Sequence, residues 1–321
     1  MANMSEAPRS PIRMLMIGKP GAAKTTSLAA LANAGFKLRI LSYDGNEDPL
    51  YEYCTPEGLA NVDAVHLGDK LHGGDDWIDS AEPTGFRDGL RLMDRWCYDE
   101  SGRILGKPPV DFKTKEVMPY NPPATGKVTD LGSSKDWGPD TIVVLDSLTA
   151  MGDCAMMKVR RRLNKTKGDN TDRVYGIAMS EQFDFLRRVR QPGNRFHFLV
   201  TAHMKMIGPQ DFRKGESKIA EQIKEEQAEM IHTRYYPMAL GRQLPQEIAR
   251  VFPIAVLFEN KETPKGVVPQ IWTKPRTEVD LKMPSKTLSE CLPVSDGMLT
   301  IFKALGVEPP KPEATEREKE K

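Results

Sequence analysis

The sequence contains few cysteines and no long apolar run. Its four cysteines form no C-x-x-C pair, which argues against a zinc site or a disulfide framework and favours reduced thiols. No apolar run approaches the ~18 residues that a membrane-spanning helix needs, and the first residues lack the apolar core of a signal peptide. These absences lead us to expect a cytoplasmic protein with no membrane partner.

The chain also lacks an excess of charge of one sign. Its 321 residues include 46 Lys and Arg and 45 Asp and Glu, so the formal net charge is +1. Contact with nucleic acid must therefore come from local basic segments and not from the overall charge.

Short apolar segments alternate with helical patterns along most of the chain. Nearly continuous apolar strands that alternate with helices predict an α/β fold with a mostly parallel central sheet and helices on both faces. The expected strands are residues 14–17, 38–43, 141–145, 196–201 and 254–259, and the expected helices are residues 24–34, 86–99, 180–189, 218–229 and 297–305.

Three segments depart from this pattern. Residues 101–140 are rich in Gly, Pro, Lys and Asp and are too polar for a core, so we expect a surface insertion there. Residues 1–11 and 308–321 are expected to be flexible tails, since neither can bury a core. One domain is therefore predicted over residues 12–307.

A Gly-rich turn stands between the first strand and the first helix. Gly18, Lys24 and Thr25 match the phosphate-loop template G-x-x-x-x-G-K-[ST], with Ala23 in place of the second glycine. Backbone N–H groups of such a turn converge on an anion, the lysine reaches the terminal phosphates, and the threonine hydroxyl binds Mg²⁺. We expect ATP and Mg²⁺ as cofactors. The expected cofactor-binding residues are Gly18, Lys19, Pro20, Gly21, Ala22, Ala23, Lys24, Thr25 and Thr26.

An acidic residue stands at the end of another expected strand. The apolar run Thr141–Leu145 is followed by Asp146, and in phosphate-loop enzymes an aspartate at this place holds Mg²⁺. The alternative is that Asp146 only caps the next helix. We expect Thr25 and Asp146 to form the metal site.

Together these motifs resemble the RecA-type ATPases. The segment LDSLTAM around Asp146 is similar to their apolar–Asp–Ser–apolar signature, and Asp48-Pro49-Leu50-Tyr51 is similar to a tetrapeptide after the second core strand of bacterial RecA. Alignment on that tetrapeptide implies that Asp44 activates the attacking water, where RecA has a glutamate. Glu47 is the alternative acid, and a loop or helix-cap role is open for both.

The resemblance implies roles for three further residues at later strands. His203 follows the apolar strand FHFLVTA and would sense the γ-phosphate, although a lone histidine at a strand end is more often structural. Lys274 and Arg276 match a Lys-x-Arg element that reaches a neighbouring subunit's nucleotide and stabilises transition-state charge. Strand-flanking cations are usually only solvated, and this alternative stays open.

Two basic segments correspond to the DNA-contacting loops of the RecA family. The expected DNA-binding residues are Arg160, Arg161, Arg162, Lys165, Lys167, Lys205, Arg213 and Lys214. Cations on such segments follow a phosphate backbone with little sequence specificity.

The resemblance is nearest to the compact RecA-core ATPases of bacteriophages. It implies a DNA-dependent ATPase that forms a ring or filament and acts on single-stranded DNA in recombination, annealing or replication. The resemblance also implies a place in the host cytoplasm, if the protein is phage-encoded, and recombination or replication proteins as possible partners. The alternatives are a helicase or packaging motor, or a nucleotide-dependent assembly protein with little turnover.

Overall fold

The centre of the molecule is an eight-stranded sheet in the order β12-β11-β10-β1-β7-β6-β2-β3. The computed structural model describes residues 10–69, 83–111, 114–163, 172–191, 193–207, 234–240, 248, 251–264 and 266–311. The strands of the sheet are β1 (Arg13–Gly18), β2 (Lys37–Ser42), β3 (Val62–His66), β6 (Thr141–Asp146), β7 (His197–Ala202), β10 (Ile254–Thr263), β11 (Gly266–Trp272) and β12 (Cys291–Pro293). From β10 to β3 all neighbours are parallel, whereas β11 and β12 are antiparallel additions at one edge.

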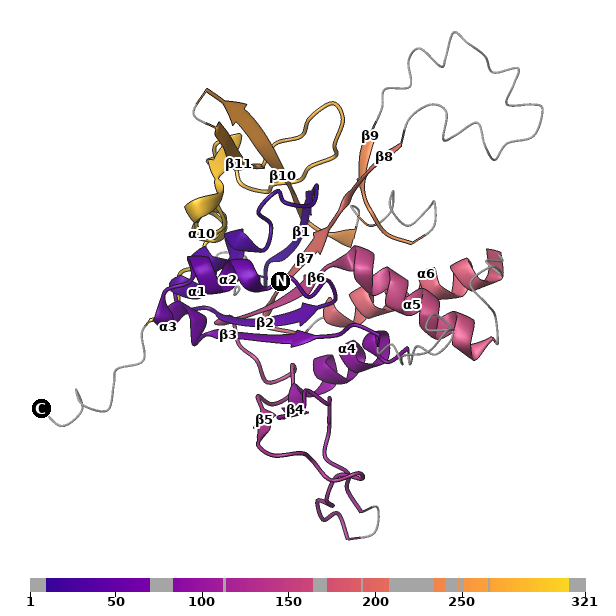
Figure 1. Ribbon diagram of the computed structural model, residues 1–321. Helices are drawn as coiled ribbons and strands as arrows, with labels where there is room; N and C mark the ends of the chain where they lie inside the picture. The colour runs from indigo at the N-terminus through magenta and orange to yellow at the C-terminus, as the bar shows by residue number, and fades with distance from the viewer. Residues whose placement is uncertain are drawn as a thin grey trace, which may run out of the picture.

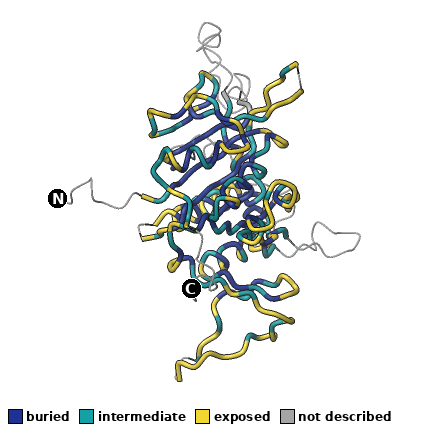
Figure 2. Tube along the Cα trace, turned by 90° about the vertical axis from the view of Figure 1, so that its left-hand side faces the viewer, coloured by how far each residue is buried: buried dark blue, intermediate teal, exposed yellow. Residues whose placement is uncertain are grey.

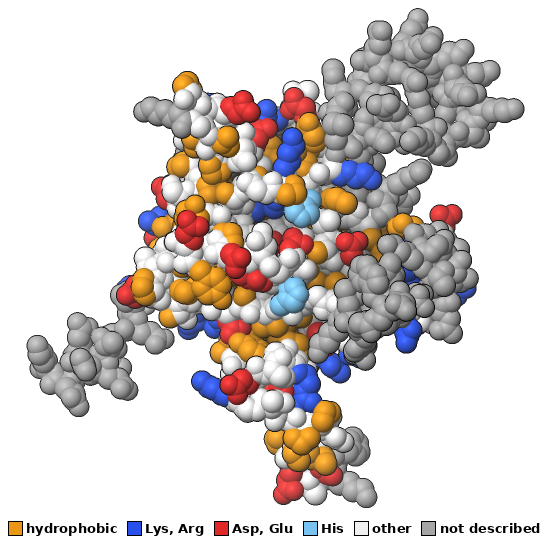
Figure 3. Space-filling view, viewed as in Figure 1, with side chains coloured by type: hydrophobic (Ala, Val, Ile, Leu, Met, Phe, Trp, Pro, Cys, Tyr) orange, Lys and Arg blue, Asp and Glu red, His pale blue; other side chains and the backbone are white. Residues whose placement is uncertain are grey.

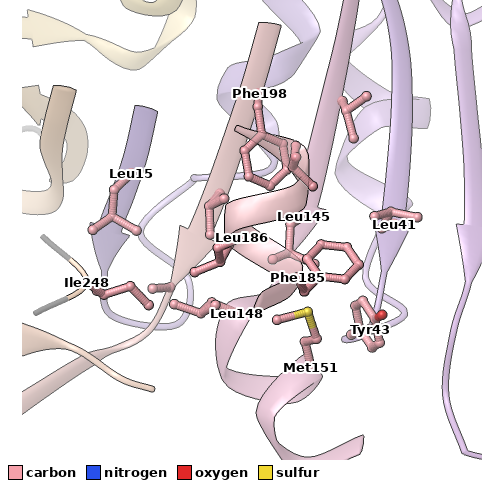
Figure 4. Close-up of a cluster of buried hydrophobic side chains, with 14 of the residues drawn as sticks. Leu15, Leu41, Tyr43, Leu145, Leu148, Met151, Phe185, Leu186, Phe198 and Ile248 are labelled. Carbon is pink, nitrogen blue, oxygen red and sulfur yellow. The ribbon is translucent and has the colours of Figure 1, made fainter. Parts of the chain in front are cut away.

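The inner strands are apolar throughout because both faces of the sheet are covered. In β6, Val143 and Leu145 join the core on one face, and Ile142 and Val144 join the core on the other. Side chains of a strand alternate between faces, so a strand that is buried twice needs apolar residues at every position. Figure 4 shows part of the first core, where Leu15, Leu41 and Leu145 from the sheet lie near Met151 and Phe185 from helices.

Helices lie on both faces of the sheet (Figure 1). The first core includes residues of α4 (Gly85–Asp94), α5 (Leu148–Arg162) and α6 (Asp172–Val189). The second core includes residues of η1 (Thr26–Leu28), α1 (Ala29–Asn33), α2 (Asp48–Tyr53) and α10 (Val294–Ala304). The short helix α3 (Pro56–Leu59) precedes β3. This arrangement confirms the predicted α/β class with a mostly parallel sheet covered on both faces.

The predicted surface insertion is also present. It starts from β4 (Cys97–Asp99), which pairs antiparallel with β5 (Val128–Asp130), and most of its residues are exposed, as the lower arm in Figure 2 shows. The buried side chains of Ile104 and Trp137 join the first core and anchor the arm to the body. A second small pair, β8 (Met204–Ile207) and β9 (Arg234–Pro237), follows the end of β7.

The structure corrects two expectations about helices. The helix expected over residues 86–99 ends at Asp94, because Cys97–Asp99 form β4. The segment after Asp146 is a 15-residue helix, α5, although its basic residues suggested a loop. Apolar residues that recur along α5 are buried in the first core, so tertiary packing decides its conformation. The helix expected over residues 218–229 and most of both tails lie outside the described residues.

No helix in the described part of the chain is long and apolar enough to cross a membrane.

Candidate functional site

The carboxyl ends of β1, β7, β6 and β2 lie side by side at one edge of the sheet. Gly18 ends β1, His203 follows β7, Asp146 ends β6 and Asp44 follows β2. The register places Ile17 of β1 beside Ala202 of β7 and Ser42 of β2 beside Asp146 of β6. Because parallel strands present their carboxyl ends at the same edge, four segments distant in sequence meet there.

The phosphate-loop candidate joins β1 to η1. Gly21 and Ala23 adopt left-handed backbone conformations, with φ of +73° and +63°. Ala23 therefore has the conformation that favours the glycine of the template, at a cost of roughly 1–2 kcal/mol for an L-residue. The loop also contacts β10, where the Asn260 side-chain amide donates to the carbonyl of Gly21 over 3.3 Å.

Lys24 is folded back into its own loop. Its Nζ donates to the carbonyl oxygens of Gly18 over 2.9 Å and Lys19 over 3.0 Å, and the residue is buried. Burial lowers the pKa of Lys24, and the nearby charges of Asp146 and Asp44 oppose this effect. Within the described part of the chain Lys24 forms no ion pair, so none has to be broken when an anion enters the loop.

Thr25 and Asp146 are in direct contact. The Thr25 hydroxyl donates to Oδ2 of Asp146 over 2.8 Å, and the Thr201 hydroxyl donates to Oδ1 of the same carboxylate. Burial raises the pKa of Asp146, and these two hydrogen bonds oppose the rise. The two residues expected to form a metal site are thus adjacent, and both offer oxygen atoms, the ligands that Mg²⁺ prefers.

Asp44 and His203 face each other across the edge. His203 Nε2 lies 3.6 Å from Oδ2 of Asp44. Burial raises the pKa of Asp44, but the neighbouring side chains of His203 and Ser147 and the charge of Lys24 outweigh burial, and the net pKa is lowered. Asp44 is therefore a carboxylate at neutral pH, as a residue that orients and partly deprotonates water must be.

The backbone around His203 is fixed by the start of α5. The Thr149 hydroxyl accepts from the N–H of His203 over 3.2 Å and donates to the carbonyl of Met238 over 2.9 Å. The N–H of Met238 in turn donates to the carbonyl of His203. His203 Nδ1 is buried and has no hydrogen-bond partner among the described residues. His203 thus connects Asp44 to the β8–β9 pair.

Glu47, the alternative acid, precedes α2 at its N-cap position. Its Oε1 atom is buried and, like His203 Nδ1, unpaired within the described part of the chain. Buried polar atoms in native proteins are usually hydrogen-bonded, so an unpaired carboxylate oxygen here is consistent with a water or ligand partner.

Lys274 and Arg276 follow β11 and lie outside this contact network. Arg276 pairs with Glu259 over 2.6 Å and with Glu278 over 3.9 Å, and its guanidinium lies 4.7 Å from the ring centre of Trp272. Lys274 is exposed.

The structure describes four of the eight expected DNA-binding residues. Arg160, Arg161 and Arg162 form the last turn of α5, where Arg162 pairs with Glu181 of α6 over 3.2 Å. Placing them on a loop was therefore wrong. Lys205 is exposed on β8. The other four, Lys165, Lys167, Arg213 and Lys214, lie outside the described residues.

The site includes two residues whose roles the sequence patterns did not predict. Thr201 holds Asp146 and Ser147 contacts Asp44, as described above. Thr201 and Ser147 lie within the quoted strand-end motifs, but only the pairing of strands shows which side chains face the carboxylates.

Comparisons with known proteins give only distant likenesses. No protein-family model and no curated protein matches the sequence. The crystal structure of the RadB recombinase aligns with a TM-score of 0.38 at 12% identity, over 85% of each chain. The flagellar accessory protein FlaH from Methanocaldococcus jannaschii aligns with a TM-score of 0.35 at 9% identity, over 88% of this chain and 84% of that chain. Likenesses at this level carry no argument about function, which we infer from the site.

Proposed function

We propose that the protein is a RecA-like phosphate-loop ATPase that binds ATP with Mg²⁺ at the carboxyl edge of the sheet and hydrolyses it. The observation that carries the proposal is the hydrogen bond between Thr25 and Asp146, which joins the loop after β1 to the acidic end of β6. The same two residue types in the same relation hold the magnesium ion of phosphate-loop NTPases.

Each group at the edge has a role in this proposal. The loop N–H groups and Lys24 bind the phosphates, and Lys24 exchanges its carbonyl partners for phosphate oxygens. Thr25 would bind Mg²⁺ directly, with Asp146 beside it. A Mg²⁺ ion held there would supply positive charge that neutralises the phosphate oxygens. Asp44, or alternatively Glu47, orients the attacking water and accepts its proton, and His203 detects the γ-phosphate.

The first experiment measures phosphate release from ATP by Lys24→Ala. Loss of the ammonium group should abolish release, whereas Lys37→Ala should retain it. Lys37 is a suitable control because it pairs with Asp140 over 2.9 Å at the opposite end of β2. Phosphate release by Lys24→Ala at the wild-type rate would refute the proposed site. ATP binding by the wild type without phosphate release would favour the assembly protein.

A second pair of variants separates the two acids. Asp44→Asn and Glu47→Gln each remove a base while keeping size, and the true base should lose roughly 10²–10⁴-fold in turnover with ATP binding retained. If both variants lower turnover only slightly and to the same extent, neither Asp44 nor Glu47 is the base.

We further propose that hydrolysis is coupled to single-stranded DNA in an oligomer. Exposed Lys205 on β8, which follows His203 directly, supports a link between the nucleotide and DNA. Lys274 and Arg276 would reach the nucleotide of a neighbouring subunit. If so, a mixture of inactive Lys24→Ala and inactive Lys274→Ala proteins should recover phosphate release, because mixed oligomers contain intact sites. Hydrolysis that ignores single-stranded DNA at low salt would refute the coupling.

A further inference from the structure

A second surface with its own charge pattern lies along α4, outside the phosphate-loop candidate. Two cavities of about 330 and 620 Å³ flank this helix, and Arg87 and Arg91 line both. The first cavity lies between α4, the end of β3 and the base of the insertion; the second lies between α4, the end of α6 and the segment at Lys135. We call the two cavities together the α4 groove.

The α4 groove carries an excess of cations. Its described lining includes five cationic side chains, Arg87, Arg91, Arg103, Lys135 and Arg188, and two acidic side chains, Asp88 and Asp94. Figure 3 shows Lys and Arg side chains gathered where the insertion meets the body.

The acids neutralise only part of this positive charge. Asp94 pairs with Lys107 over 2.8 Å, outside the groove lining. Asp88 lies at the longer distances of 3.7 Å from Arg87 and 3.5 Å from Arg91, whose side chains are 55% and 49% exposed. For Lys135 and Arg188, both exposed, no acidic partner is present in the described ranges.

One wall of the groove is rigid. Arg103 pairs with the fully buried carboxylate of Asp99 over 3.2 Å, and it donates to the carbonyls of Pro122 and Pro123 over 3.1 and 2.7 Å. This fixes the base of the insertion at the mouth of the first cavity. The remaining cations stand on α4, on α6 and at Lys135, and the side chains of Arg87, Arg91, Lys135 and Arg188 are exposed to a bound polymer.

The chemistry of the lining selects a polyanion. Arg87 and Arg91 stand one helical turn apart, about 6 Å along α4, and so present a row of charges and not a single point. Guanidinium groups bind phosphate oxygens through two parallel hydrogen bonds. Among the described residues that line the first cavity, only Tyr120 and the imidazole of His66 offer rings. Base stacking is therefore limited, and the backbone is the main target.

We propose that the α4 groove binds the phosphodiester backbone of a nucleic-acid strand, as a contact surface separate from Arg160–Arg162 and Lys205. The inference rests on the proposed function for the identity of the polymer, which is single-stranded DNA.

The groove also reaches the candidate catalytic loop. His66 lines the first cavity, and its ring packs against Gly45, the neighbour of Asp44. A Cβ atom at Gly45 would lie 2.8 Å from Cε1 of His66, so the two are in close contact. His66 thus connects a DNA strand bound in the groove to the loop that carries Asp44. Through this contact, bound DNA can affect the position of Asp44 and so the rate of hydrolysis.

The test is the affinity for a fluorescent single-stranded oligonucleotide, measured by anisotropy between 50 mM and 1 M salt. The variant Arg87→Gln/Arg188→Gln removes two groove cations, and Lys286→Gln/Lys303→Gln removes two exposed cations elsewhere as a matched control. Each lost phosphate contact lowers the slope of log K against log salt by about 0.7. The groove variant should therefore lose about 1.4 from the slope and about 25-fold in affinity at 0.1 M salt, with equal affinities at 1 M. The control should match the wild type.

A single substitution guards against a folding artefact. Lys135→Gln, on the wall opposite α4, should lose about 0.7 from the slope and about 5-fold in affinity at 0.1 M salt. Circular dichroism melts establish that each variant is folded.

The outcomes separate the two proposals. If the wild type does not bind the oligonucleotide at 50 mM salt, both the DNA-coupled function and the groove are refuted. If the wild type binds and the groove variants match the control in affinity and slope, the groove is refuted and the proposed function stands. Lys24→Ala should bind the oligonucleotide with the wild-type slope in the absence of nucleotide, because the groove lies outside the phosphate loop.

Discussion

The buried carboxylate of Asp146 should lower the stability of the ligand-free protein, and replacing it by asparagine should raise that stability. Asp146 is 6% exposed and accepts hydrogen bonds from Thr25 and Thr201. An asparagine has the same shape, its carbonyl can accept from Thr201, and its amide can donate to the Thr25 hydroxyl. Asp146→Asn therefore keeps both hydrogen bonds and removes only a charge that burial disfavours.

The expected gain in the free energy of unfolding at pH 7 is about 0.5–2 kcal/mol, the range typical of a single stabilising substitution. The gain should depend on pH. Burial raises the pKa of Asp146 above its ordinary value of 3.8, so the folded state binds a proton more tightly than the unfolded chain. The stability of the wild type then falls as pH rises from 3.8 through the raised pKa. The advantage of the variant should appear over that window and stay constant above it.

Urea unfolding from pH 4 to pH 8 measures this advantage, and Asp140→Asn is a control of opposite sign. Burial raises the pKa of Asp140, but the ion pair with Lys37 outweighs burial and the net pKa is lowered. Asp140→Asn should therefore cost up to about 1 kcal/mol, a small cost because the Asp140 side chain is 37% exposed. This cost should stay constant from pH 4 to pH 8, because it is lost only below that range, as pH falls through the lowered pKa.

Mg²⁺-ATP supplies the second readout of the same variant. A ligand at 100 times its dissociation constant stabilises the folded state by about 2.7 kcal/mol. The wild type should show such a gain, and Asp146→Asn should show a smaller one. An Asp146→Asn protein that is less stable than the wild type at pH 7, or a difference that does not change with pH, would refute the reasoning.

Two further predictions concern the loop and the base of the insertion. Ala23→Gly removes about 1–2 kcal/mol of strain from the left-handed backbone conformation at this position. It also costs about 0.5–1 kcal/mol, because glycine gives the unfolded chain more conformational freedom, so the thermal midpoint should rise by about 1–3 °C. A lower midpoint would show that packing of the Ala23 methyl group outweighs the strain. Asp63→Ala removes the carboxylate that accepts hydrogen bonds from Trp96 Nε1 over 2.6 Å and from the Tyr98 hydroxyl over 2.9 Å. It should lower the free energy of unfolding by about 1–3 kcal/mol, measured by urea unfolding with tryptophan fluorescence, whereas Asp63→Asn should lower it less. Equal costs for the two variants would show that hydrogen bonding is not the cause.

Much of the fold follows from local patterns. The five strands expected from apolar runs are all present as β1, β2, β6, β7 and β10, because a strand buried on both faces is apolar at every position. The loop from Gly18 to Thr26 is found between β1 and η1 because its glycine, lysine and threonine spacing is a local property. Even the conformation of Ala23 was readable from the template, which has glycine at that position.

Helix α5 was not predicted because its local signal is ambiguous. Its last turn contains Arg160, Arg161 and Arg162, whose charges suggested a solvated segment. Its helical conformation depends on burial of Met151, Ala155 and Val159 against α6 and the sheet. The α4 groove was equally hidden, since Arg87, Arg103 and Arg188 are far apart in the sequence and only the packing of α4 between the insertion and α6 brings them together.

The sequence by itself determined the class of fold, the phosphate-loop candidate and the strand-end acids, because each depends on residue types at short spacings. The tertiary structure decided which of these groups meet. It placed β7 between β1 and β6, so that Thr201 and His203 lie beside Asp146 and Asp44, and it joined Thr25 to Asp146 across 121 positions of the sequence. Strand order is set by the packing of two whole cores, and no local pattern contains that information.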